Sequence, residues 1–132
     1  MVTRDSDTSR VERLLAVSGS MVNTYTKGNR VEKKCRELFE KEGWLTWKPS
    51  RAKYNSNDAF GLFDCILIRG AEVAFMQVKS APSHFYTARK FIAHWITENK
   101  LMITAIISLY EGDNNWRIER YDLLKREWIK YT

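Results

Sequence analysis

The stretch that decides the fold is residues 64–79, DCILIRGAEVAFMQVK. Gly70 and Ala71 separate two runs of apolar and β-branched residues, and a Gly-X pair at this place predicts a β-hairpin with a type II′ turn. The turn sets the register of the opposite pairs, which we expect to be Arg69 with Glu72, Ile68 with Val73, and Ile66 with Phe75. One local signal therefore predicts two adjacent strands and their alignment.

The same register brings polar side chains together at the open end of the hairpin. Asp64 is expected opposite Gln77, and Lys79 lies two residues further along the same face. Both faces of the hairpin between its ends are apolar, and such strand pairs are usually covered by helices on both sides. A carboxylate, an amide and an ammonium then converge at one end of a buried sheet, where polar groups without partners are costly.

Two explanations fit this convergence. One is structural, with an Asp64–Lys79 ion pair and Gln77 as a plain polar residue at the strand end. The other is a hard divalent cation, because Mg²⁺ binds a few protein oxygens and keeps several waters. Its ligands here are the Asp64 carboxylate, the Gln77 side-chain carbonyl and the main-chain carbonyl of Val78. A bound water could attack a phosphodiester, with Lys79 orienting it or neutralising charge.

The rest of the chain predicts an α/β domain with a central mixed sheet flanked by helices. At 132 residues the chain fits one domain, and we expect an N-terminal, partly flexible arm over 1–28 followed by a domain over 29–132. The expected elements are a helix from an Asn29 cap to a Gly43 stop, strands over 44–49, 63–69, 72–80, 102–110 and 116–123, a helix capped by Ser83, and a short helix over 123–131.

Charge and cysteine usage limit the class of protein. The net charge of +6 favours a polyanionic partner such as nucleic acid. The longest apolar stretch, residues 101–110, is far shorter than the roughly 20 residues of a membrane span, and the N-terminus lacks a secretory pattern. Cys35 and Cys65 occupy apolar positions, so we expect two reduced core thiols in an intracellular, cytoplasmic protein.

Basic and aromatic residues around the predicted site are candidates for DNA contacts, because cations meet phosphates and aromatic rings stack on unpaired bases. The polar loop over 50–63 is long for a compact domain, and long loops are often functional. The candidates are Lys27, Arg30, Lys48, Arg51, Lys53, Tyr54, Arg89 and Lys90.

An acid on the first helix (Glu32), an Asp at a strand start (Asp64) and the run Gln77-Val78-Lys79 resemble the PD-(D/E)XK nuclease superfamily over about residues 26–110. Within it, the short basic chain and its opening KGNRVEKKCRELFEKEGW look most like the archaeal-type Holliday junction resolvases. The resemblance implies a restriction-endonuclease-like αβββαβ core and a homodimeric, Mg²⁺- or Mn²⁺-dependent endonuclease of DNA recombination and repair that cuts branched DNA. It also implies that Asp64 and Gln77 hold the metal with Val78, that Lys79 serves the attacking water, and that Glu32 assists.

Two positions depart from the family pattern. Phe63 replaces a proline, at a position that varies. Gln77 replaces an acid, and an amide binds Mg²⁺ less well because it lacks the charge. Virus-type replication-repair nucleases look similar and often carry Gln-x-Lys, so a nuclease acting on flaps or nicked DNA is an alternative. Others are an inactive nucleic-acid-binding module of the same fold and a purely structural protein.

Some single residues also have simpler explanations or alternatives. Glu32 lies three residues after Asn29 and could complete a capping box. Asp58, in the long loop, could substitute as the acid. His84 and His94 are ten residues apart, without the spacing of metal ligands, and are expected at the surface.

Overall fold

The computed structural model describes residues 20–48 and 59–131, with the side chains of residues 20–27 left out. The chain divides into two compact units, residues 1–30 and 31–132. The described part of the first unit is the beginning of helix α2 (Ser20–Lys41), and the second unit holds the remainder of α2, all the strands and helix α3 (Pro82–Glu98). Neither described helix is long and apolar enough to cross a membrane.

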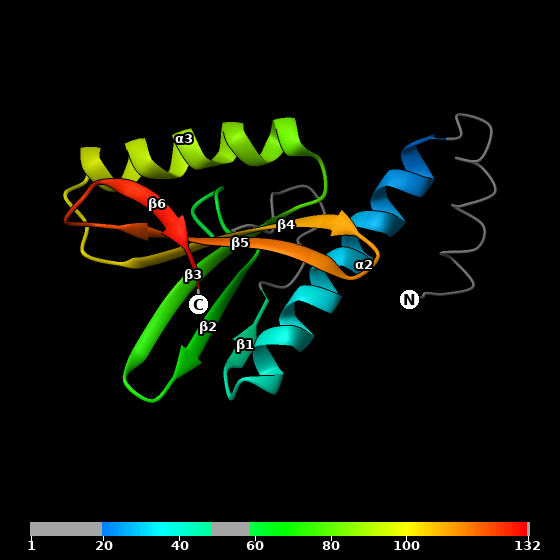
Figure 1. Ribbon diagram of the computed structural model, residues 1–132, viewed down its shortest axis with the longest axis horizontal. Coiled ribbons are helices and arrows are strands. Elements are labelled where there is room, and N and C mark those ends of the chain that lie inside the picture. The colour runs from blue at the N-terminus through cyan, green and yellow to red at the C-terminus, as the bar shows by residue number, and fades with distance from the viewer. Residues whose placement is uncertain (1–19, 49–58, 132) are drawn as a thin grey trace. The chain divides into compact units, whose positions relative to one another are not determined.

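The described strands form one six-stranded sheet in the order β1-β2-β3-β4-β5-β6. Its strands are β1 (Leu45–Trp47), β2 (Cys65–Arg69), β3 (Glu72–Lys79), β4 (Thr104–Gly112), β5 (Asn115–Asp122) and β6 (Glu127–Lys130). β3 and β4 are parallel and are connected through α3, whereas the other neighbouring pairs are antiparallel. Figure 1 shows α3 lying along the sheet. The expected α/β architecture with a mixed sheet and flanking helices is confirmed.

The hairpin of β2 and β3 has the predicted register, in which Arg69 pairs with Glu72, Ile68 with Val73, and Ile66 with Phe75. Gly70 has a φ of 60°, while Ala71 is not among the residues with positive φ. That combination is the one a type II′ turn requires. The local turn chemistry therefore aligned the strands as expected.

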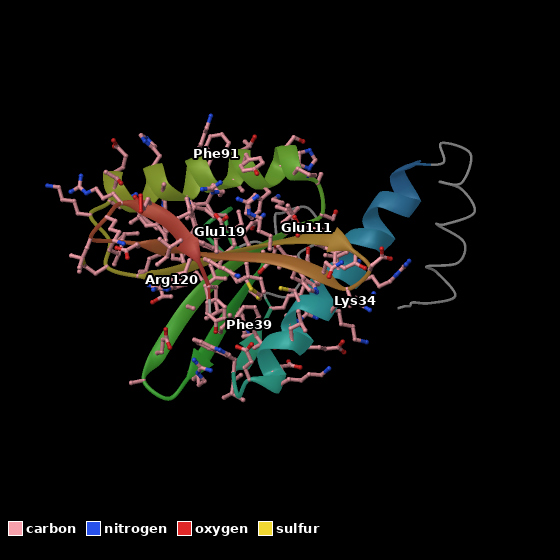
Figure 2. All side chains as sticks on the ribbon, viewed as in Figure 1. Lys34, Phe39, Phe91, Glu111, Glu119 and Arg120 are labelled. Atoms are coloured by element: carbon pink, nitrogen blue, oxygen red, sulfur yellow. The ribbon has the colours of Figure 1, made fainter. Side chains whose placement is uncertain are left out.

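Two hydrophobic clusters lie on opposite faces of the sheet. Ile106 belongs to one and Ile107 to the other, and successive residues of a strand point to opposite faces. The first cluster packs under α2, where Phe39 lies between the helix and the strands (Figure 2). The second packs under α3, with Phe85, Ile92 and Ile96 buried. Cys35 and Cys65 are buried free thiols in the first cluster, as expected.

The predicted start of the first helix is wrong. Asn29 is not an N-cap, because α2 already runs from Ser20 and continues through it. Gly28 and Asn29 have low helix propensity, but both keep the backbone N–H that proline lacks, so they weaken a helix without breaking it. Gly43, in contrast, follows the helix end with a φ of 93°. The predicted stop is therefore confirmed. The division into an arm and a domain stays a prediction.

Two further boundaries differ from expectation. The cap of α3 is Ala81, not Ser83, because Pro82 takes the first helical position, for which its fixed φ is suited. The expected helix over 123–131 is the strand β6 instead. The Asp122 carboxylate accepts hydrogen bonds from the main-chain N–H groups of Leu124 and Lys125, which makes a turn that returns the chain along β5.

Candidate active site

Asp64 lies at the point where β2 begins beside the end of β3. Its main-chain N–H donates to the Met76 carbonyl at 2.8 Å, and its buried carboxylate accepts a 2.7 Å hydrogen bond from the main-chain N–H of Val78. The N–H and C=O of one residue in an extended strand project to the same side. The Val78 carbonyl therefore faces the side of β3 on which Asp64 lies.

Gln77 and Lys79 flank Val78 and contact each other. The orientation of the Gln77 amide is assigned from its neighbours: its nitrogen donates to the main-chain carbonyl of Leu62, and its oxygen accepts from Lys79 Nζ at 2.8 Å. Gln77 is buried and Lys79 is half-buried. The predicted trio of Asp64, Gln77 and Lys79 is thus gathered around one peptide unit, and the Lys79 ammonium contacts the amide.

A hollow of about 250 Å³ opens beside Gln77 and Lys79. Its walls come from the end of β3, from the turn at Gly61 and Leu62, and from the first three turns of α3. The helix contributes His84, Thr87, Ala88, Phe91 and Ile92 to the lining. His84 therefore lies beside the candidate site, whereas His94 is at the surface and 3.9 Å from Glu98.

Glu32 on α2 and Lys48 after β1 form a second polar pair. Lys48 Nζ lies 3.0 Å from Glu32 Oε1, and both side chains are partly exposed. Since α2 is already helical at Asn29, the capping-box reading of Glu32 is wrong. The pKa of the Cys35 thiol is raised to about 12, chiefly by burial and to a smaller extent by the charges of Asp64 and Glu32. The two carboxylates therefore both lie near Cys35.

The candidate DNA-contacting residues lie on different elements and differ in exposure and in their partners. Lys90 is exposed on α3 and directly precedes Phe91, a lining residue of the hollow, in the sequence, and Arg30 is exposed on α2. Lys48 is paired with Glu32. Arg51, Lys53, Tyr54 and the alternative acid Asp58 lie outside the described residues, as does the side chain of Lys27.

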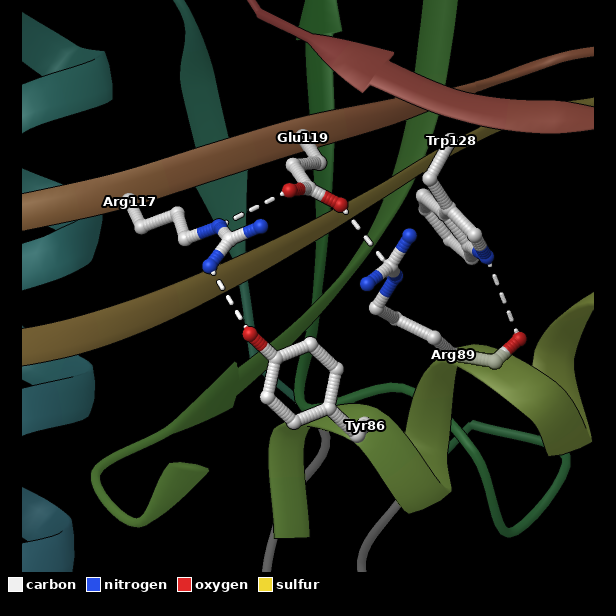
Figure 3. Close-up of polar contacts among 5 residues, drawn as sticks. All are labelled: Tyr86, Arg89, Arg117, Glu119 and Trp128. Carbon is white, nitrogen blue, oxygen red and sulfur yellow. Dashed lines mark hydrogen bonds and ion pairs between the residues drawn. The ribbon is translucent and has the colours of Figure 1, made fainter. Parts of the chain in front are cut away.

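Arg89 belongs to an ion cluster that fixes α3 to the sheet (Figure 3). Arg89 Nε lies 3.2 Å from Glu119 Oε1, and Arg117 Nε donates to Glu119 Oε2 at 2.9 Å. The hydrogen bond to Glu119 is the main cause that raises the pKa of Arg117. Tyr86 and Trp128 complete the cluster with bonds to Arg117 and to the Arg89 carbonyl. Arg89 thus has a structural role, and its contact with DNA stays a prediction.

The donors at the end of β3 fit a hard divalent cation by their chemistry. The Asp64 carboxylate and the Val78 carbonyl face the same side of the strand, with the Gln77 oxygen one residue away. Among the described residues, no group of three or more His, Cys, Asp and Glu could hold a metal ion. A single carboxylate with neutral oxygens would leave the other positions around such a cation to waters, several of which Mg²⁺ commonly keeps.

Neither a family model nor a curated protein sequence matches the chain. Among solved structures, the chain is similar to Archaeoglobus fulgidus Hjc, a Holliday junction resolvase from an archaeal hyperthermophile. The TM-score is 0.45 at 15% identity, over 68% of this chain and 74% of that one.

Two parts of the site gave little signal in the sequence. The Leu62 carbonyl is a main-chain group, which any residue would supply, and only the fold places it against Gln77. The pairing of Glu32 with Lys48 joins a helix to the end of a strand. Opposite charges sixteen residues apart in the sequence do not indicate a contact.

Proposed function

We propose that the chain is a metal-dependent, structure-selective DNA endonuclease that hydrolyses phosphodiester bonds, uses Mg²⁺ or Mn²⁺, and acts as a homodimer on branched DNA. The observation that carries the proposal is the gathering of Asp64, Gln77 and Lys79 around the Val78 peptide. The net charge of +6 supports a nucleic acid as the partner. Symmetric cutting of a junction needs two sites, which a two-fold dimer supplies.

In this proposal each residue has a separate task. Asp64, Gln77 and Val78 would supply oxygen ligands, and the metal when bound would lower the pKa of a water and stabilise the developing negative charge. Lys79 lies 2.8 Å from the Gln77 oxygen, where its ammonium orients the attacking water and offsets charge on the phosphate. Glu32 would assist through the water shell, held in place by Lys48.

A silent nucleic-acid-binding module is the second candidate, and one feature favours it. The side-chain oxygens of the site already have protein donors, since Glu32 pairs with Lys48, Gln77 with Lys79 and Asp64 with the Val78 N–H. A metal ion must compete with these contacts. Junction binding without cutting in any divalent metal would establish this second function.

Cleavage tests the proposal directly. Purified protein is incubated with labelled four-way junction, flap, nicked duplex, linear duplex and single strand, with Mg²⁺, with Mn²⁺ and with EDTA. We expect paired symmetric nicks in the junction, their loss in EDTA, and their loss in Asp64→Asn, which keeps an oxygen for the Val78 N–H. Asp113→Asn, in an exposed turn, controls for the charge change. Cuts confined to flaps or nicked DNA would move the function to a repair nuclease.

Metal binding provides a readout that is independent of cutting. Titration calorimetry with Mn²⁺ should give a binding signal for the wild type and a weaker one for Asp64→Asn. Glu32→Gln and Glu37→Gln form a matched pair on α2, because Glu32 is paired with Lys48 and Glu37 is exposed. A role of Glu32 at the site requires slower cleavage in the first variant and unchanged cleavage in the second.

A further inference from the structure

Arg117 on β5 is held by three side chains and is still partly exposed to solvent. Its Nε donates to Glu119 Oε2 at 2.9 Å, and its Nη1 donates to the Tyr86 hydroxyl at 2.9 Å (Figure 3). The guanidinium also lies over the Phe85 ring, 5.5 Å from its centre. A guanidinium carries more N–H donors than these two bonds use, and the side chain is 42% exposed. The group is therefore fixed in position with donors on its solvent side.

The cluster around Glu119 holds more positive than negative charge. Glu119 is buried and shares its two oxygens, since Arg89 Nε lies 3.2 Å from Oε1 and Arg117 Nε 2.9 Å from Oε2. Two guanidiniums thus face one carboxylate. Arg89 is the less exposed of the two, at 25% against 42%. The surplus positive charge is therefore presented to solvent through Arg117, where an external anion can pair with it.

Arg117 lies in the same row of the sheet as Lys79. Lys79 pairs with Leu109 on β4, and Leu109 pairs with Arg117 on β5. Leu109 and Phe75 both pack in the cluster under α3, and residues an even number apart in a strand share a face, so Lys79 lies on the α3 face. Arg117 lies there too, because it bonds to Tyr86 of α3. Neighbouring strands are about 4.8 Å apart, so the backbones at Lys79 and Arg117 are separated by about 10 Å.

The chemistry and the spacing suit the phosphates of one nucleic-acid strand. A strand of B-DNA carries one charge for every ~3.4 Å of helix axis, so about 10 Å corresponds to about three nucleotides. Arginine binds phosphate through parallel N–H groups, and an aromatic surface such as that of Phe85 and Tyr86 keeps its flat group oriented. The Tyr86 hydroxyl accepts from Arg117, so its own hydrogen is free to donate to a phosphate oxygen.

We propose that Arg117 and Tyr86 form a phosphate-binding site that holds the DNA strand about three nucleotides from the phosphate at Lys79. The inference rests on the proposed function in one respect, because the bound anion is a phosphodiester of the substrate. Glu119 is a positioning residue, which orients Arg117 and does not touch the DNA. A strand held at both points presents one particular bond to Lys79, so the site fixes where the strand is cut.

Junction binding by Asp64→Asn in EDTA, measured at several salt concentrations, tests the site without requiring cleavage. Arg117→Gln in this background should weaken binding and reduce the salt slope by about 1, the share of one phosphate. Arg120→Gln is the matched control, because Arg120 is exposed on the same strand but lies on the opposite face. It removes the same charge and should leave the slope unchanged. Equal effects of the two substitutions would overturn the proposal.

Neutral methylphosphonates, placed at one phosphate of the junction at a time, locate the contact. One position should weaken binding by the protein that retains Arg117 and have no effect on Arg117→Gln, in which that contact is already lost. Tyr86→Phe keeps the ring and should lose part of the same contact, so it carries the test if Arg117→Gln fails to fold. A purely structural role of Arg117 predicts equal effects at every position in all these proteins, and that result refutes the site.

The outcomes separate this inference from the proposed function. In the cleaving protein, Arg117→Gln should spread the cuts over neighbouring bonds. Binding that depends on Arg117 in a protein that cuts no DNA would leave the phosphate site standing and refute the nuclease. Cutting whose position and affinity are unchanged in both Arg117→Gln and Tyr86→Phe would refute the phosphate site and leave the nuclease standing.

Discussion

At position 77 a single amide is held from both sides. Its nitrogen donates to the Leu62 carbonyl and its oxygen accepts from Lys79. A carboxylate at this position would keep the contact with lysine but would place a second acceptor against the carbonyl. A buried carbonyl that loses its donor costs free energy. The surroundings of Gln77 therefore favour glutamine over glutamate in the metal-free protein, although a carboxylate would bind a divalent cation more strongly.

Gln77→Glu should consequently lower the stability of the metal-free protein by about 1–3 kcal/mol, measured by urea unfolding in EDTA. Asn99→Asp is the control, because Asn99 also donates from its amide to a main-chain carbonyl, that of Trp95, but is exposed. Water can replace that bond, but the new negative charge lies at the C-terminal end of α3, where it costs about 0.3–1 kcal/mol, so the control should lose less than about 1 kcal/mol. Equal losses of stability in both variants would show that the buried hydrogen bond from Gln77 to the Leu62 carbonyl stabilises the protein no more than the exposed bond of Asn99.

At the scale of elements, α3 has one face packed against the sheet and another face exposed to solvent. Ile92 is fully buried against the sheet, and its neighbour Phe91 is 62% exposed. Ile92→Ala should lower the free energy of unfolding by about 2–5 kcal/mol because it leaves a cavity. Phe91→Ala should change it by less than about 0.5 kcal/mol. Urea unfolding of both variants measures the contrast, and a large loss in Phe91→Ala would contradict this orientation of α3.

The contact between α2 and the β2–β3 hairpin buries both thiols. Cys35 Sγ lies 3.8 Å from Met76 Sδ, and burial raises the pKa of Cys35 to about 12 from an ordinary 9.0 and that of Cys65 as well. Native protein at pH 8 should therefore leave a disulfide reagent unreacted and release two equivalents only in denaturant. A fast reaction without denaturant would show that the helix does not cover this face.

The same shift in pKa gives a pH dependence of stability. The unfolded chain loses the Cys35 proton near pH 9.0, whereas the folded chain keeps it to about pH 12. The contribution of the buried thiol is complete below pH 9 and is lost as the pH rises towards 12. Urea midpoints should fall over this window in the wild type, and fall less in Cys35→Ala. Urea midpoints that fall equally with pH in the two proteins would contradict the raised pKa of Cys35.

Elements were predictable where the signal is local. The Gly70-Ala71 turn aligned β2 with β3, and alternation then placed Gln77 and Lys79 on one face. The start of α2 was not predictable, because most of the nine residues that precede Asn29 in the helix have low helix propensity, yet they do not break the backbone bonding. The Leu62 carbonyl and the Glu32–Lys48 pair depend on how distant segments pack. The exposure of Leu45, Trp47 and Val73 was missed for a similar reason, since an apolar sequence pattern does not show whether the face is covered.

At the scale of the whole molecule, the sheet puts the candidate site and the β5–β6 turn at different ends. Lys79 pairs with Leu109 near the end of β4, whereas Arg120, just before that turn, pairs with Ile106 nearer the start of β4. Basic residues at the two ends should therefore contribute unequally to DNA binding, although they count equally in the net charge of +6.

Salt dependence tests this asymmetry. In Asp64→Asn, which is expected to lose cutting, the logarithm of the junction affinity should fall linearly with the logarithm of the salt concentration, by about 0.9 for each phosphate contacted. Lys90→Ala, in the exposed part of α3 one residue before Phe91 of the hollow, should weaken binding and reduce that slope by about 1. Lys125→Ala, in the β5–β6 turn, removes the same charge and should leave the slope unchanged. Equal effects of both substitutions would mean that the DNA responds to net charge alone, and an affinity independent of salt would rule out a phosphate-binding surface.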